Sequence, residues 1–212
     1  MNKSNRFLHN ADCNAMFYAP RQWQPEGGPY SVEAIRRYVN QAADVGYDTF
    51  LCNPNGSCPW YPSKAVRSAL EGYTRGDLSF PKRGSPEIDR SMVALYDLYL
   101  DLVEAGVDWL AEVAAMCRAR SMAPWLTIRM NDQHGWKIPE APENCDLYHD
   151  RRFHLSGRMP NPDFAGPDRR TMGGLNYERK EVRDHMFALI RETRSEERRV
   201  GKECRSRWSP YH

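Results

Sequence analysis

The chain of 212 residues contains no long run of apolar residues. Nothing in it approaches the ~18–20 consecutive apolar residues that a membrane-spanning helix needs, so no membrane partner is expected. The start, MNKSNRFLHNADCNAMF, also lacks the apolar core of ~7–15 residues found in a secretory signal. We therefore expect a cytoplasmic location. Hydrophobic residues make up 41% of the chain, which is typical of a globular protein with a buried core.

Cysteine is sparse and follows no metal-binding or redox spacing. The chain has six cysteines and no Cys-x-x-Cys pair. One of them lies in an unusual C-terminal segment, and an odd number remains without it. Reduced thiols are therefore favoured over a disulfide framework or a zinc site. The five cysteines concerned are Cys13, Cys52, Cys58, Cys117 and Cys145.

A strong charge of either sign is also missing. The chain has 30 Lys and Arg against 28 Asp and Glu. Residues 194–212 contribute six of the basic and three of the acidic residues, which leaves 24 against 25 for residues 1–193. This balance gives no electrostatic reason to expect a nucleic-acid partner. No glycine-rich phosphate fingerprint follows the first expected strand, which argues against a bound dinucleotide.

The C-terminal segment RSEERRVGKECRSRWSPYH, residues 194–212, differs from the rest of the chain in having no apolar period. Its basic composition, rich in serine and arginine, is typical of a disordered arm. The segment also resembles the translation of a short-read sequencing adapter, whose DNA begins AGATCGGAAGAG and encodes Arg-Ser-Glu-Glu. We therefore predict a domain over 1–193 that continues in a longer protein, and an artefactual disordered tail over 194–212.

Strand-like and helix-like segments alternate along residues 1–193. A short strand is expected at RFLHNADC, and Ser31 and Gly46 bound a stretch with apolar residues at helical spacing. The runs DTFLCN (48–53) and PWLTIRM (124–130) are typical of strands, with two helical stretches between them. A final helical stretch around 182–190 follows a long loop. The order β-α-β-α-α-β-loop-α predicts an α/β fold with a parallel sheet.

The lengths of the connections indicate where a site would lie. Both long loops, 54–86 and 131–178, follow the carboxyl ends of strands, whereas the returns from helix to strand are brief. A (β/α) barrel shows this asymmetry, although a doubly wound open sheet also places its site at the strand ends. We predict a partial (β/α)₈ TIM barrel of about three to four N-terminal βα units that is not closed.

Polar side chains at the expected strand ends are candidate ligand-binding residues. Because side chains alternate across a strand, the aliphatic residues of PWLTIRM are expected to face the helices and its polar residues the opposite side. The polar ends of three strands would then converge on one pocket beside aromatic residues of the loops. This combination suits a polyhydroxylated ring such as a sugar. The predicted carbohydrate-binding residues are Asp12, Asn53, Trp60, Arg129, Asn131, Asp132, His134 and Trp136.

Each candidate also has a purely structural interpretation. Arg129 is equally compatible with an ion pair inside the fold, and the two tryptophans with small cores of their own loops. Asn55, beside the candidates, is a common turn former. Asp132 and His134 could hold a metal, but two ligands without a third are weak evidence. No metal and no cofactor are predicted.

Three stretches resemble the glycosyl-hydrolase-like TIM barrels of the family-10-like group. DTFLCNPNGSCPWYPSKA is similar to the family's second strand and the turn after it, with its Tyr-Pro-Ser. DWLAEVAAMCRARSMAPWLTIRMND is similar to the next helix and strand, and LNYERKEVRDHMFALIRE to the start of the following helix. The resemblance covers roughly 45–65 and 108–193. Where the family usually turns on Gly, this chain has Ser121, which must adopt a left-handed or bridging conformation.

The resemblance implies a protein that hydrolyses or binds carbohydrate. The family's acidic active-site motif would come shortly after Thr193, so the two carboxyls that glycoside cleavage requires are expected outside this chain. Asp132 is the candidate for a catalytic carboxylate within it. We therefore expect that the chain as given has no glycosidase activity and folds poorly. The alternative is a non-catalytic barrel that binds a glycan or a partner.

Overall fold

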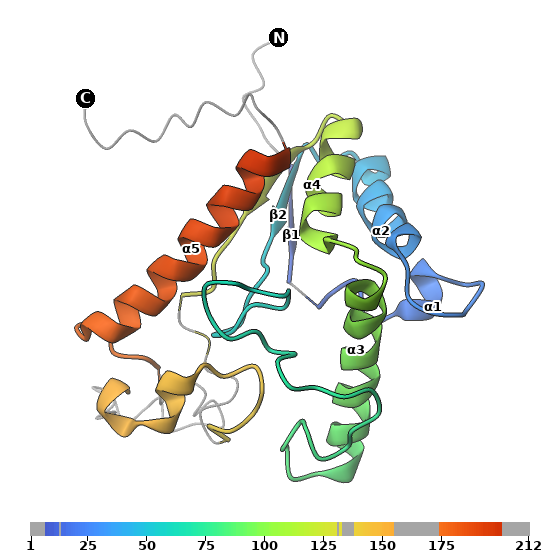
Figure 1. Cartoon of the computed structure of the whole chain (residues 1–212). Helices are drawn as coiled ribbons and strands as arrows, with labels where there is room; N and C mark the ends of the chain where they lie inside the picture. Colours follow the sequence, from blue (N-terminus) through green and yellow to red (C-terminus); the bar gives the residue numbers. More distant parts are fainter. Residues whose placement is uncertain (1–6, 13, 131, 133–137, 155–173, 201–212) are drawn as a thin grey trace, which may run out of the picture.

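The computed structural model describes residues 7–12, 14–130, 132, 138–154 and 174–200. Three short strands form one sheet in the order β1-β2-β3 (Figure 1). They are β1 (Leu8–Ala11), β2 (Thr49–Cys52) and β3 (Ala123–Leu126). Both strand pairs are parallel, with Leu8 opposite Thr49 and Thr49 opposite Ala123. The α/β class and the parallel pairing expected from the sequence are thereby confirmed.

Helices fill the connections between the strands and follow the last one. None of the helices in the described part of the chain is long and apolar enough to cross a membrane. In chain order the elements are α1 (Pro20–Trp23), α2 (Val32–Val45), α3 (Pro86–Glu104), α4 (Trp109–Ala119), the 3₁₀ turns η1 (Asp146–His149) and η2 (Arg151–Phe153), and α5 (Lys180–Val200).

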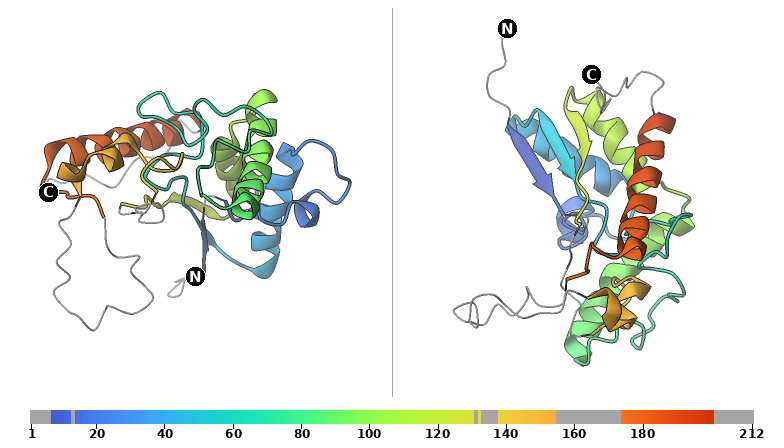
Figure 2. Two further views of the ribbon diagram at one scale, coloured as in Figure 1. Left: turned by 90° about the horizontal axis from the view of Figure 1, so that it is seen from below. Right: turned by 90° about the vertical axis from the view of Figure 1, so that its left-hand side faces the viewer.

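The helices cover one face of the sheet and leave the other open (Figure 2). Phe50 and Cys52 of the central strand point to the covered face and are buried. Tyr38 of α2 meets the ring of Phe50 edge-on at a centroid distance of 5.9 Å. On the open face, Leu8 and Trp125 are 49% and 52% exposed. Alternation along the strands places these two sets of side chains on opposite faces of the sheet, as strand geometry requires.

The helix over 32–45 forms where the apolar spacing predicts it. Its buried residues recur at helical intervals, and Gly46 ends it with a φ of 96°, a left-handed conformation that glycine adopts at little cost. Ser31 does not cap it with its side chain. Instead, the backbone N–H and the hydroxyl of Ser31 both donate to Oε1 of Gln24 at 2.9 Å. Ser121 has a φ of 58°, which is the left-handed one of the two conformations predicted for it.

An aromatic core joins the 54–85 loop to α3. The rings of Phe17 and Tyr99 stack at 3.7 Å between centroids, and those of Tyr99 and Trp60 at 5.2 Å. Two residues before Tyr99 on α3, Asp97 accepts a hydrogen bond of 2.6 Å from the hydroxyl of Tyr73. These contacts pack the loop against a helix that extends beyond the carboxyl edge of the sheet (Figure 1). They fix the wall of the pocket described below.

The predicted partial (β/α)₈ barrel is wrong. The described residues form an open sheet of three strands of only four residues each, accompanied by five helices. The second crossover contains two helices, of which α4 packs on β3 while α3 packs on the aromatic loop. A barrel needs a regular succession of tilted, staggered strands, each followed by its own helix. The short strands and the doubled helix do not provide it.

Helix α5 crosses the predicted division of the chain at 193/194. Helix α5 continues past Thr193 through Arg194, which is exposed, to Val200. Residues 201–212 lie outside the described residues. The division of the chain at 193/194, and the artefactual origin of the tail, stay predictions.

Candidate functional site

A pocket of about 240 Å³ lies at the carboxyl edge of the sheet. It receives residues from the end of every strand: Asp12 follows β1, Gly56 follows β2, and Arg129 and Asp132 follow β3. The carboxyl edge of a parallel sheet is where ligands of α/β proteins usually bind. The other lining residues are Asn14, Tyr18, Trp60, Arg83, Met92 and Glu143.

Two asparagine side chains extend the sheet toward the pocket. The residue after Asn53 is Pro54, which has no N–H to donate to a ladder. Instead, Nδ2 of Asn53 donates to the carbonyl of Thr127 at 2.7 Å. Asn55, fully buried, accepts from the N–H of Arg129 and donates to its carbonyl, both at 3.1 Å. The two amide side chains therefore replace the backbone hydrogen bonds of a strand and hold residues 127–129 in place.

The loop after β2 also positions Glu143. The hydroxyl of Ser57 donates to the carbonyl of Glu143 at 2.9 Å and accepts from the N–H of Cys145 at 2.8 Å. The N–H of Cys58 donates to the same carbonyl at 3.0 Å. Helix α5 fastens the loop in turn, because Nε2 of His185 donates to the carbonyl of Ser57 at 2.9 Å. Residues far apart in sequence are thus locked together beside the pocket.

Two guanidinium–carboxylate pairs contribute to the pocket. Arg129 pairs with Asp12 at 2.6 Å, joining the ends of β3 and β1. Arg83 pairs with Glu143, whose Oε2 also accepts from the hydroxyl of Tyr96 at 3.4 Å. Nε of Arg83 is buried and has no hydrogen-bond partner among the described residues. The pocket therefore presents both hydrogen-bond acceptors and hydrogen-bond donors. Each guanidinium is paired with a carboxylate, so the two pairs add no net charge to the pocket.

Asp132 approaches the backbone at Gly56. The Asp132 side chain is buried, with the residue 8% exposed. A Cβ atom on Gly56 would lie 2.5 Å from Oδ2 of Asp132, so only glycine leaves room for this carboxylate. The hydroxyl of Tyr148 donates to the backbone carbonyl of Asp132. The buried carboxylate of Asp132 is therefore a polar group in the lining of the pocket.

The cysteines near the pocket are unsuited to nucleophilic chemistry. Burial raises the pKa of the Cys145 thiol to about 11 and that of Cys58 further above its ordinary value. Both thiols therefore carry their proton at neutral pH, and the thiolate is the reactive form. The four cysteines of the described residues are buried and form no disulfide, while Cys13 lies outside the described residues. No cluster of three potential metal ligands occurs among the described residues.

The predicted site residues have different places in the structure. Asp12, Trp60, Arg129 and Asp132 line the one pocket. Asn53 is buried beneath it and serves the backbone of β3. Asn131, His134 and Trp136 lie outside the described residues.

Trp60 combines its two predicted roles. It lines the pocket, yet it is only 5% exposed because its ring is stacked on Tyr99. Its face is therefore taken by the protein. The exposed ring at the pocket is that of Tyr18, which is 69% exposed and whose hydroxyl accepts from Asn14 at 2.8 Å. Tyr18 follows β1 by only a few residues, and the aromatic content of that loop was the signal that could have identified it.

Arg83 and Glu143 were not predicted either. Both come from long loops, shortly before the next helical element, and no local pattern marks them. They enter the pocket through the backbone hydrogen bonds that join residues 57–58 to 143–145. Only the tertiary structure brings them to the strand ends.

Comparison with models of known protein families gives no match, and a search of curated protein sequences finds no relative. Assignment of a function therefore depends on the geometry of the pocket.

Proposed function

We propose that the pocket at the carboxyl edge of the sheet binds a small carbohydrate. The observation that carries the proposal is the convergence of Asp12, Arg129, Asp132 and the Arg83–Glu143 pair on one pocket of about 240 Å³. Hydroxyl groups both donate and accept hydrogen bonds, so a sugar can use carboxylate acceptors and guanidinium donors at once. An anionic ligand would face three carboxylates, and both guanidinium groups of the pocket are already paired with two of them.

Two further features support a polyhydroxylated ring. The exposed ring of Tyr18 offers an apolar surface against which the C–H groups of a sugar can pack. The buried Nε of Arg83 has no partner among the described residues, and such groups usually obtain one from water or a ligand. The volume of about 240 Å³ is below the ~300–1,000 Å³ typical of ligand pockets, which favours a small ligand such as a mono- or disaccharide.

Calorimetric titration with a panel of neutral mono- and disaccharides tests the proposal. At least one sugar should bind to the chain, and Arg129→Gln should weaken that binding about tenfold or more, since a hydrogen bond to a charged group contributes about 1.5–3 kcal/mol. Arg120→Gln is the matched control, because Arg120 forms an ion pair with Asp44 at the opposite end of β3. Equal loss in both variants, or no binding to any sugar, would contradict the proposal.

Glycoside hydrolysis is a second candidate, favoured by the presence of Asp132 and Glu143 in the same pocket. Cleavage needs two carboxyl groups, ~5–5.5 Å apart for retention or ~6.5–9.5 Å apart for inversion. Glu143 is engaged by Arg83, which leaves Asp132 as the carboxylate to test. For this chain we expect binding without hydrolysis of aryl glycosides. If the chain instead releases the aryl alcohol from an aryl glycoside, and Asp132→Asn abolishes that release, glycoside hydrolysis would be established.

The cytoplasmic location is part of the same proposal. The buried, reduced thiols of the described residues are compatible with a reducing compartment. Fractionation of cells that express the full gene would test it: recovery in the cytosol is expected, and recovery in a secreted fraction would contradict it.

A further inference from the structure

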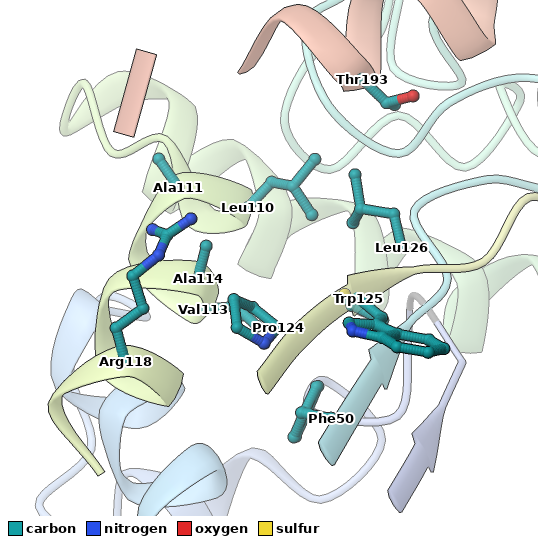
Figure 3. A pocket seen from close by; sticks show the side chains of 11 residues that line it. Phe50, Leu110, Ala111, Val113, Ala114, Arg118, Pro124, Trp125, Leu126 and Thr193 are labelled. Atoms are coloured by element: carbon teal, nitrogen blue, oxygen red, sulfur yellow. The ribbon is translucent and has the colours of Figure 1, made fainter. Parts of the chain in front are cut away.

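A second pocket lies on the helix-covered side of the sheet, bounded by α4, β3 and α5 (Figure 3). Its walls include the side chains of Phe50, Leu110, Val113, Pro124 and Leu126. The room that it offers to the centre of a water-sized sphere is only about 30 Å³. The pocket is therefore a narrow apolar slot. It shares no lining residue with the pocket at the strand ends.

Small residues on α4 keep the slot open. Ala111 and Ala114, three residues apart, stand on the same side of the helix and line the slot (Figure 3). A larger side chain at either position would occupy the space. Thr193 on α5 also lines the slot, but its hydroxyl donates to the carbonyls of Leu189 and Ile190 at 3.0 and 3.1 Å. That hydroxyl is satisfied within its own helix and adds little polarity to the wall.

Arg118 gives the slot a positive charge at one end. It follows Ala114 by one helical turn, is exposed and lines the pocket. Among the side chains that the structure describes, which on α5 end at Arg194, its guanidinium has no ion-pair or hydrogen-bond partner. The next arginine, Arg120, is by contrast engaged by Asp44 at 2.5 Å and by Asn40 at 2.7 Å. An unpaired guanidinium beside an apolar slot is complementary to an anion that carries an apolar chain.

We propose that this slot binds a straight-chain monocarboxylate, with the alkyl chain between α4 and β3 and the carboxylate on the guanidinium of Arg118. The apolar walls exclude a polar ligand body, because its hydrogen-bonding groups would be buried without partners. The narrowness excludes rings and branched chains. The ligand class and the place both differ from those of the proposed carbohydrate site.

Binding of hexanoate, octanoate and cyclohexanecarboxylate to the full chain, measured by calorimetry below micellar concentrations, tests the proposal. Octanoate should bind more tightly than hexanoate, by about fourfold for each methylene that enters the slot. Cyclohexanecarboxylate should bind at least tenfold more weakly than octanoate. Absence of octanoate binding at millimolar concentration, or equal binding of the ring compound, would overturn the proposal.

Three variants locate the site. Ala114→Leu should abolish octanoate binding by filling the slot, and Ala111→Leu provides a second filling variant if the first does not fold. Arg118→Gln should weaken octanoate binding about fivefold, the effect of one exposed ion pair of about 1 kcal/mol, while leaving octanol binding unchanged. Arg120→Gln is the matched control and should leave octanoate binding unchanged. Equal effects of the two arginine variants, or full binding by a folded slot-filling variant, would contradict the assigned place.

Discussion

Removal of the Asn55 side chain tests how the pocket is held together. In Asn55→Ala the backbone N–H and carbonyl of Arg129 lose the two hydrogen bonds of 3.1 Å that Asn55 provides. Each partly buried backbone group left without a partner costs about 1–3 kcal/mol, and solvent that reaches Arg129 offsets part of this. We expect the free energy of unfolding to fall by about 2–4 kcal/mol. This is a large fraction of the ~5–15 kcal/mol that stabilises an ordinary domain.

Urea denaturation followed by circular dichroism measures the effect. The midpoint should fall while the slope with urea stays unchanged, and the melting temperature should drop by roughly 5–15 °C. Asn55→Asp is informative because it keeps the acceptor for the N–H of Arg129 but turns a second oxygen toward its carbonyl; it should be at least as unstable as Asn55→Ala. Asn10→Ala, which removes an exposed amide on the edge strand β1, is the control and should change stability by less than about 0.5 kcal/mol. An Asn55→Ala protein within that limit would refute the role of the asparagine clamp.

Three further predictions concern other parts of the molecule. Gly56→Ala should destabilise the protein by about 1–3 kcal/mol, because the added methyl group would overpack against Oδ2 of Asp132. The same substitution should cost clearly less in an Asp132→Ala background. Additive effects in the double-mutant cycle would contradict the close approach of the Asp132 carboxylate to Gly56. Burial holds the pKa of His9 below 6.5, so as the pH falls the unfolded chain takes up a proton before the folded protein does. The free energy of unfolding should therefore decrease as the pH drops through 6.5 and level off below the folded-state pKa. His9→Gln should lack this decrease, and an identical pH profile of stability for the variant would contradict the role of His9. Burial raises the pKa values of Cys117 and Cys145 to about 12 and about 11, so iodoacetamide at pH 8 should label them only after denaturation, as peptide mass spectrometry would show; rapid labelling of the native protein would be inconsistent with their burial.

Local patterns in the sequence predict the local elements well. Apolar residues at helical spacing and the glycine at position 46 specify α2, and β-rich runs locate β2 and the start of β3. These features depend on neighbours in the chain, so they can be read without the fold. The end of β3 was predicted four residues too late, at Met130 instead of Leu126. The reason is that Pro54 and the side chains of Asn53 and Asn55 replace the backbone ladder beyond Leu126.

The global architecture could not be predicted in the same way. The order of strands and helices is shared by barrels and open sheets, and the asymmetry of loop lengths is common to both. Nothing local indicates that α3 packs on an aromatic loop and that only α4 of the second crossover packs on β3. The partial barrel was inferred from features that do not distinguish these arrangements.

The candidate site was predictable only where it depends on strand ends. Asp12, Arg129 and Asp132 follow strands, and parallel strands bring their carboxyl ends to one edge. Arg83 and Glu143 come from long loops, so their places depend on contacts such as those of Ser57 with Glu143 and Cys145. Trp60 was expected to offer a ring face, but its stacking on Tyr99 requires knowledge of the tertiary packing.

The most direct test of the carbohydrate pocket is a nuclear magnetic resonance titration of the ¹⁵N-labelled chain with the sugar that binds best in calorimetry. Binding at the strand ends should shift the backbone amide signals of Asp12, Gly56, Arg129 and Glu143, with the side-chain signal of Arg83 Nε also affected. The amides of Arg118 and Ala114, in the other pocket, should not move. Shifts confined to other parts of the molecule, or no saturable shifts with any neutral sugar, would contradict the proposed function.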